Sequence, residues 1–298
     1  MNLFIRPNSY TDIARRIMMA GLKRQYLSIP KRFFALAQEM FNVPEKPLGY
    51  QEKNSVYFLE RVVLVTGGLD SSVLYFRLKK DFPNLRAVYI NIGQPYLAKE
   101  IIALKQLGIE HETVVDLSFA GYEKNYWKHI IPARNFYFLC LVAEQMKGGI
   151  IYFASTDGEM PEVGGDKSKR FLKWTNELFT KLPYPVRIET PLENETKTDE
   201  VKWWKKNLPI KQLDYTMSCF EAEIGHCGHC QSCLRKAIAY ANNGLKLRTN
   251  TPILEGTQEY IAKYETLMPE ALKKKDFSHY SRRRCIQDLG GIELLEKQ

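Results

Sequence analysis

The sequence contains no long hydrophobic run. No stretch of about 18 consecutive apolar residues occurs in its 298 residues, so a transmembrane helix and a membrane partner are not expected. Arg6, Arg15 and Lys23 interrupt the apolar residues near the start, which argues against a secretory signal. Internal repeats and low-complexity tracts are absent too. These absences exclude membrane and repeat proteins, and we expect a cytoplasmic globular protein.

Two familiar nucleotide-binding motifs are also missing. Neither the G-x-x-x-x-G-K-[ST] loop nor the G-x-G-x-x-G turn occurs, which excludes the corresponding phosphate-binding and dinucleotide-binding sites. Cysteine is sparse, with six residues in the chain. In a cytosolic protein of this size, so few cysteines favour metal binding or catalysis over a disulfide framework.

The composition is that of a globular protein with a basic surface. Hydrophobic residues make up 45% and aromatic residues 12%, which is sufficient for a large core. The 43 Lys and Arg exceed the 34 Asp and Glu, giving a formal net charge of +9. This charge favours acidic partners such as nucleotides, nucleic acids or anionic substrates, and it is equally compatible with a merely basic surface.

The pattern of apolar residues divides the chain into three parts. Residues 1–60 show helical spacing and are expected to form a helical N-terminal extension. Residues 61–210 alternate short apolar strands, at 62–65, 86–92, 112–117 and 150–154, with helices. This alternation predicts an α/β domain with an open, doubly wound parallel sheet that binds ligands at the carboxyl ends of its strands. Residues 211–298 are expected to form a metal-binding, helical C-terminal region.

A glycine-rich turn follows the first predicted strand. Gly67 and Gly68 permit a close backbone approach, and the next helix directs unpaired N–H groups toward the turn. Together with nearby hydroxyl groups, this arrangement suits a phosphate. The alternative is a tight strand–helix turn in which Asp70 caps the helix. The complete segment reads Thr66, Gly67, Gly68, Leu69, Asp70, Ser71 and Ser72.

Four of the six cysteines lie close together near the end of the chain. Cys219, Cys227, Cys230 and Cys233 fall within fifteen residues, and four thiolates complete a tetrahedral zinc shell. An iron–sulfur cluster uses the same ligands, so the spacing leaves both open. Cys140 lies on an apolar helix and is expected in the core, and no role is assigned to Cys285.

The glycine turn resembles the Ser-Gly-Gly-x-Asp-Ser motif of the PP-loop ATP pyrophosphatase superfamily, with Thr66 in place of the first serine. This resemblance implies a PP-loop/HUP-like fold. It also implies that residues 66–72 hold the pyrophosphate part of ATP and its Mg²⁺, and that ATP is cleaved to AMP and pyrophosphate.

Segments at 91–94, 98–100, 131–135, 165–171 and 189–192, together with the cysteine cluster, resemble one family of this superfamily, QueC. The resemblance extends over about residues 61–245. It implies that Asp70, Arg134 and Lys197 are catalytic, and that Gly93 and Gln94 join the ATP site. It also implies that Arg134, Asn135, Asp157 and Asp166 bind the substrate.

QueC proteins convert 7-carboxy-7-deazaguanine to its nitrile with ATP and ammonia in queuosine biosynthesis, and the same ligase activity is implied here. The chain departs from the family pattern at residues 155–159, 164–168 and 95–96, where the substrate half of the site is expected. The ATP half keeps the pattern. This difference suggests a related enzyme with altered specificity.

Two further functions are open at this stage. A QueC-like ligase of an antiviral-defence system would join a deazaguanine acid to a protein or another amine. A non-catalytic protein would bind nucleic acid through the basic runs at 273–275 and 282–284, which otherwise form a solvated surface. A homodimer is also an open expectation, because QueC-type enzymes are often dimers.

Overall fold

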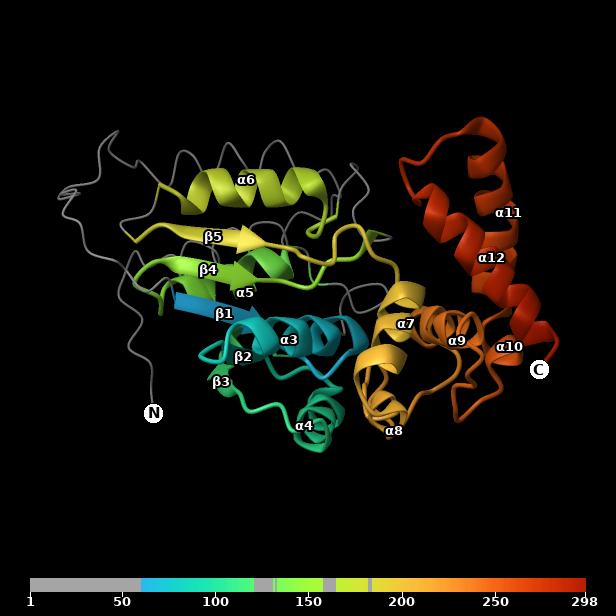
Figure 1. Ribbon diagram of the computed structural model, residues 1–298, viewed down its shortest axis with the longest axis horizontal. Helices are drawn as coiled ribbons and strands as arrows, with labels where there is room; N and C mark the ends of the chain where they lie inside the picture. Colours follow the sequence, from blue (N-terminus) through green and yellow to red (C-terminus); the bar gives the residue numbers. More distant parts are fainter. Residues whose placement is uncertain (1–59, 121–130, 132, 158–164, 182–183) are drawn as a thin grey trace.

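The computed structural model describes residues 60–120, 131, 133–157, 165–181 and 184–298 (Figure 1). The predicted helical extension, residues 1–60, lies outside these ranges apart from its last residue. Within the described ranges, no helix has the length and apolar character needed to cross a membrane.

A five-stranded parallel sheet with the order β3-β2-β1-β4-β5 forms the centre of the molecule. The predicted parallel α/β fold is therefore confirmed, with one strand more than the sequence had indicated. The strands are β1 (Glu60–Leu64), β2 (Arg86–Asn91), β3 (Glu112–Val115), β4 (Gly149–Tyr152) and β5 (Val186–Glu189).

The central strand β1 is buried on both faces, because Val62 and Val63 are both inaccessible to solvent. It pairs with β2 on one side and β4 on the other. The chain winds outward from β1 through β2 to β3, and then returns to place β4 on the opposite side. This reversal occurs between β1 and β4, and in sheets of this kind ligands bind outside the carboxyl ends of the strands at such a point.

Helices cover both faces of the sheet (Figure 1). One face packs against α5 (Arg134–Ala143) and α6 (Lys169–Phe179). The other packs against α3 (Leu69–Asp81) and α4 (Leu97–Gln106). A short 3₁₀ helix, η1 (Leu117–Phe119), follows β3. The sheet is thus doubly wound, as the alternation of strands and helices predicted.

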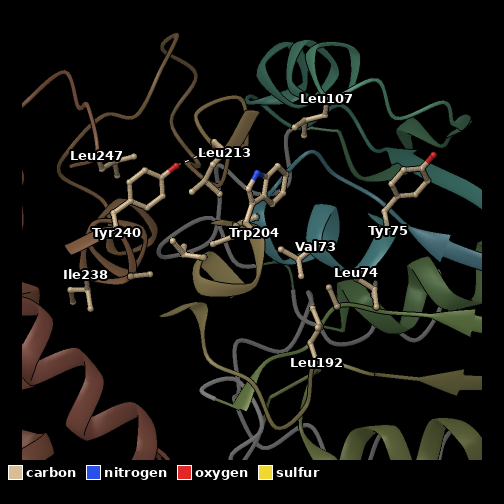
Figure 2. Packing of buried hydrophobic residues seen from close by; sticks show 14 of the residues in the cluster. Val73, Leu74, Tyr75, Leu107, Leu192, Trp204, Leu213, Ile238, Tyr240 and Leu247 are labelled. Carbon is tan, nitrogen blue, oxygen red and sulfur yellow. Dashed lines mark hydrogen bonds between the residues drawn. The ribbon is translucent and has the colours of Figure 1, made fainter. Parts of the chain in front are cut away.

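Residues 197–298 are largely helical and share their core with the sheet. Figure 2 shows Trp204 of α7 between Val73 of α3 and Leu213, and the Tyr240 hydroxyl donates to the Leu213 carbonyl over 3.1 Å. This packing fixes the C-terminal helices against α3. They are α7 (Lys197–Asn207), α8 (Ile210–Leu213), α9 (Gln231–Ala241), α10 (Ile253–Gly256), α11 (Gln258–Lys274) and α12 (Arg282–Glu296).

The basic run at the start of α12 is partly internal. Arg284 is buried, donates to Asp288 over 3.0 Å and lies over the Tyr280 ring. Arg283 pairs with Asp199 of α7 over 2.6 Å. Arg283 therefore attaches α12 to α7, and Arg284, which also donates to the Tyr264 hydroxyl over 3.3 Å, attaches it to α11. Arg282 and the lysines at 273–275 are exposed, and nucleic-acid binding through them stays a prediction.

Candidate functional site

The glycine turn lies at the carboxyl end of β1 and leads into α3. Gly67 has φ +71°, and a Cβ there would come within 2.7 Å of the Ala103 side chain in α4. Only glycine allows both this conformation and this contact. The Thr66 and Ser71 hydroxyls lie 3.1 Å apart, and the Gly68 N–H donates to the Thr66 hydroxyl over 3.3 Å. The turn therefore gathers small, polar groups at the first turn of a helix.

The first turn of α3 contains an unsatisfied polar group. The Ser72 hydroxyl is fully buried and has no hydrogen-bond partner in the part of the chain that the structure describes. Buried hydroxyls are rarely left without a partner in folded proteins. The positive end of the α3 dipole and this hydroxyl together favour a bound anion.

Lys197 is brought to the same turn from 127 residues away. It is the first residue of α7, directly after Thr196, which forms a capping box with Asp199. Its ammonium group pairs with the Asp70 carboxylate, and the two side chains are only 10% and 16% exposed. Two predicted catalytic residues therefore meet at the glycine turn.

Gln94 and Gly93 follow β2, beside this turn. The Gln94 side-chain N–H groups donate to the Tyr89 hydroxyl over 2.6 Å and to Glu100 over 2.9 Å, and its carbonyl oxygen accepts from the Ile92 N–H. Gly93 has φ +77° and packs closely against Ala120. The Gln94 amide is thus engaged within the protein, and its predicted contact with ATP stays a prediction.

Glu100 at the start of α4 is a carboxyl group near the turn with a raised pKa. Burial raises its pKa from 4.5 to about 7, although hydrogen bonds from Tyr89 and Gln94 and the charges of Arg134 and Lys99 oppose this rise. The carboxyl group is therefore protonated more readily in the folded protein than in the unfolded chain.

We expect a Glu100→Gln variant to be more stable than the natural protein at pH 8, by about 1–3 kcal/mol, and to differ little near pH 4.5. Because the pKa of Glu100 is higher in the folded than in the unfolded state, its proton stabilises the folded protein fully below pH 4.5. This stabilisation is lost as the pH rises through about 7. Urea unfolding at several pH values measures the difference. Glu110→Gln, an exposed change just after the same helix, serves as the control, and an unchanged difference across this pH range would refute the expectation.

Arg134, Asn135 and Asp166 form a second polar group at the start of α5. The Asp166 carboxylate accepts from the Asn135 backbone N–H over 3.1 Å, and Arg134 donates to the Tyr96 hydroxyl over 3.2 Å. Burial alone would lower the Arg134 pKa, but Tyr96, Asp166 and Glu100 raise it. The buried Arg134 Nε has no partner among the described residues. The three predicted substrate-binding residues therefore lie together, with a donor available.

Ala133, directly before Arg134, has φ +57°. This left-handed conformation costs about 1–2 kcal/mol for a residue with a Cβ. We expect Ala133→Gly to raise the free energy of unfolding by about 0.5–1 kcal/mol. Glycine removes the strain of the left-handed conformation, and this gain exceeds the additional backbone entropy that glycine loses on folding. Ala143→Gly, at the last residue of α5 and in helical geometry, should instead destabilise. Thermal unfolding of both variants tests this difference, and equal losses would contradict it.

Asp157 faces a different neighbour. Its carboxylate accepts a hydrogen bond from Ser281, the residue that caps α12, and its backbone N–H donates to the Glu195 carbonyl over 2.9 Å. Asp157 therefore attaches the C-terminal helix to the end of β4. The predicted contact of this residue with substrate is not among these interactions and stays a prediction.

The four clustered cysteines lie next to α9. The sulfur atoms of Cys219, Cys227, Cys230 and Cys233 lie within 4.8 Å of one another, and three of these side chains are buried. Zinc–sulfur bonds of about 2.3 Å in a tetrahedron separate the sulfurs by about 3.8 Å. The Cys227 and Cys233 sulfurs are 3.8 Å apart. The donor set and its spacing thus fit a metal ion, as the sequence predicted.

A second layer of polar residues supports this cluster. Lys236 of α9 is buried, and its ammonium group donates to the Thr216 carbonyl and hydroxyl oxygens and lies 3.1 Å from His226 Nε2. The other ring nitrogen of His226 lies 4.0 Å from the Cys233 sulfur. Burial lowers the pKa of His226 to about 3, so the ring is neutral. A neutral imidazole can donate an N–H to the Cys233 thiolate. Outer hydrogen bonds of this kind orient the ligands of metal sites.

Several of these residues had no assigned role in the sequence analysis. Glu100 and Lys236 lie in or beside predicted motifs, but their hydrogen bonds with Tyr89 and Thr216 depend on how the chain packs. Lys236 gave no distinct signal in the sequence, because Gln231, Ser232 and Arg235 of the same helix are polar as well. Its burial was not predictable without the packing of α9.

Comparison with known proteins finds similarity to one family of enzymes. Residues 120–244 match the sequence model of the family described as "Queuosine biosynthesis protein QueC". The 7-cyano-7-deazaguanine synthase of Methanocaldococcus jannaschii is 28% identical, with 64% of this chain and 98% of that protein aligned. The enzyme of the same name from Nitratiruptor sp. is 26% identical, over 63% of this chain and 96% of that protein.

A solved structure is similar at greater distance. The U34-tRNA thiolase NcsA from Methanococcus maripaludis, with its [4Fe-4S] cluster, has 15% sequence identity and a TM-score of 0.41, over 90% of this chain and 82% of that one. The QueC match includes Arg134, Lys197 and the four cysteines, whereas the glycine turn precedes it. The contact between Lys197 and Asp70 therefore joins the matched segment to the turn.

Proposed function

Because residues 120–244 match the QueC family model, we propose that this chain uses ATP to activate the carboxylate of a 7-deazaguanine and converts it with ammonia, through the amide, to the nitrile. The observation that carries this proposal is the ion pair between Asp70 and Lys197. The pair brings a lysine of the matched segment to the glycine turn, which supports a single site for activation and substrate binding.

In this proposal, residues 66–72 bind the pyrophosphate part of ATP. The α3 N-terminus and the hydroxyls of Thr66, Ser71 and Ser72 supply N–H and O–H donors, and Asp70 binds Mg²⁺. Lys197 offsets negative charge on the phosphates as the bond to the α-phosphorus breaks. Catalysis then depends on positioning and charge, and needs no nucleophilic side chain.

Arg134, Asn135 and Asp166 form the acid-binding half. The unpartnered Arg134 Nε is a donor for a carboxylate or carbonyl oxygen of the substrate. Asp166 accepts hydrogen bonds, which suits the N–H groups of a guanine-like base, and its contact with the Asn135 N–H holds it at the start of α5. The Tyr96 hydroxyl accepts a hydrogen bond from the Arg134 guanidinium and so helps to hold it in place.

The reaction uses two molecules of ATP, one to activate the carboxylate and one to activate the amide. The substrate carboxylate oxygen attacks the α-phosphorus of ATP and releases pyrophosphate, giving an acyl adenylate. Ammonia attacks the acyl carbon, loses a proton and releases AMP, which leaves the amide. The amide oxygen attacks a second ATP in the same way, and loss of AMP and two protons gives the nitrile.

The four cysteines would hold a structural Zn²⁺, for which their buried, compact arrangement is suited. The ion would supply folding energy by joining the loop at 219–230 to α9, with no part in the reaction. An iron–sulfur cluster is the alternative occupant, and metal analysis of the folded protein distinguishes the two.

Product analysis tests the proposal. The protein is incubated with ATP, Mg²⁺, ammonium and 7-carboxy-7-deazaguanine, and the products are followed by mass spectrometry. We expect the nitrile, AMP and pyrophosphate. AMP release without nitrile would favour a ligase that uses another amine, such as a protein. An absence of nucleotide cleavage with salt-sensitive nucleic-acid binding would favour a binding protein and contradict the proposal.

A further inference from the structure

The segment before the first clustered cysteine contacts the glycine turn directly. The Met217 backbone N–H donates to the Gly67 carbonyl over 2.7 Å. The next residue, Ser218, accepts a hydrogen bond from the Leu69 N–H over 3.3 Å, across 149 residues of sequence. The metal-binding loop and the turn assigned to ATP therefore meet through residues 217 and 218.

Ser218 occupies a position where phosphate oxygens are expected. Leu69 is the first residue of α3, so its N–H is one of the helix N-terminal donors that face a bound anion. A Cβ on Gly68 would lie 3.6 Å from the Ser218 hydroxyl oxygen, which places this oxygen alongside the turn. The Thr66 hydroxyl lies 3.2 Å from the same Gly68 position. Ser218 thus extends the ring of hydroxyl groups around the turn.

The Ser218 hydroxyl has a proton still to donate. A serine hydroxyl provides one donor and two acceptor sites, and the Leu69 N–H uses one acceptor site. Among the described residues, no acceptor receives the Ser218 proton. A phosphate oxygen in the turn would receive it, and the Leu69 N–H would strengthen this donation by polarising the hydroxyl.

The position of Ser218 is fixed on both sides. Thr216, two residues earlier, accepts from buried Lys236 through its carbonyl and hydroxyl oxygens. Cys219, the next residue, belongs to the cysteine cluster. This attachment places the hydroxyl in advance of nucleotide binding, which reduces the entropy lost when a contact forms.

We propose that the Ser218 hydroxyl is a ligand of the β- or γ-phosphate of ATP, presented to the glycine turn by the metal-binding loop. The inference rests on the proposed function, because it requires residues 66–72 to bind pyrophosphate. It adds a phosphate ligand that lies outside the glycine motif.

Calorimetric titration with inorganic pyrophosphate, a non-hydrolysable ATP analogue and AMP, each with Mg²⁺, tests this role. Ser218→Ala should weaken binding of pyrophosphate and the analogue about 10- to 100-fold, as expected for loss of a hydrogen bond to a charged group. AMP binding and metal content should be unchanged. Ser218→Thr, which keeps the hydroxyl, should bind within about threefold of the natural protein.

Thr249→Ala is the matched control, because this hydroxyl also belongs to the metal-binding region and donates to the Thr251 carbonyl beside Gly228. It should leave pyrophosphate binding unchanged. Unaltered pyrophosphate binding in Ser218→Ala would overturn the inference, as would equal weakening of AMP binding together with metal loss. If the natural protein bound neither pyrophosphate nor the analogue, the proposed function itself would fail.

Discussion

A Lys197→Met variant is expected to lose about 1,000-fold or more of its ATP-dependent turnover. Loss of a single preorganised donor to developing charge commonly costs about 100- to 1,000-fold. Here the change also leaves the Asp70 carboxylate without its ammonium partner in a largely buried setting, which is costly in itself. Steady-state measurement of AMP release gives the effect.

Lys202→Met on the same helix is the control, because Lys202 is exposed and lies one turn and a half further along α7. It should retain nearly full turnover. A folded Asp70→Asn/Lys197→Met double variant, compared with each single variant, separates the cost of an unpaired charge from the catalytic loss. More than a tenth of natural turnover in folded Lys197→Met protein would contradict the role given to this residue.

Cys233→Ser should abolish stable metal binding and, with it, nucleotide binding. Cys233 is buried in the cluster, and structural zinc sites contribute about 10–16 kcal/mol to folding in small domains. The loop that would lose its metal begins at Cys219, directly after Met217 and Ser218, which contact the glycine turn. Metal content by mass spectrometry should fall from about one ion per chain to a small fraction.

Cys140→Ala provides the comparison, since this cysteine is buried in α5 and lies outside the cluster. It should keep its metal and its affinity for ATP, with a modest loss of stability from the smaller side chain. A Cys233→Ser protein that bound ATP normally without metal would show that the metal loop does not support the glycine turn.

Local patterns were sufficient to predict the parts of the site that are continuous in sequence. The strand at Val62 and Val63, the turn after it and the cysteine spacing each depend on neighbouring residues, so their geometry follows from backbone rules. The strand β5 was missed because Val186 and Ile188 give only two inward positions, too few to identify a strand in a four-residue segment.

Contacts between distant segments could not be predicted in the same way. The pairing of Asp157 with Ser281 and of Ser218 with Leu69 depends on how the C-terminal helices pack on α3 and α7. This packing is set by buried residues such as Trp204, whose contacts are spread over several helices (Figure 2). A sequence pattern reports that such a residue is apolar, and leaves its partners undetermined.

We propose that the glycine turn and the segment matched to QueC form one site that adenylates a carboxylate. Transfer of ¹⁸O tests it most directly, with 7-carboxy-7-deazaguanine labelled in both carboxylate oxygens as substrate. We expect each nitrile to form with two molecules of AMP, each carrying one labelled oxygen, and with unlabelled pyrophosphate. Nitrile formed with labelled inorganic phosphate and ADP, or AMP without label, would contradict it.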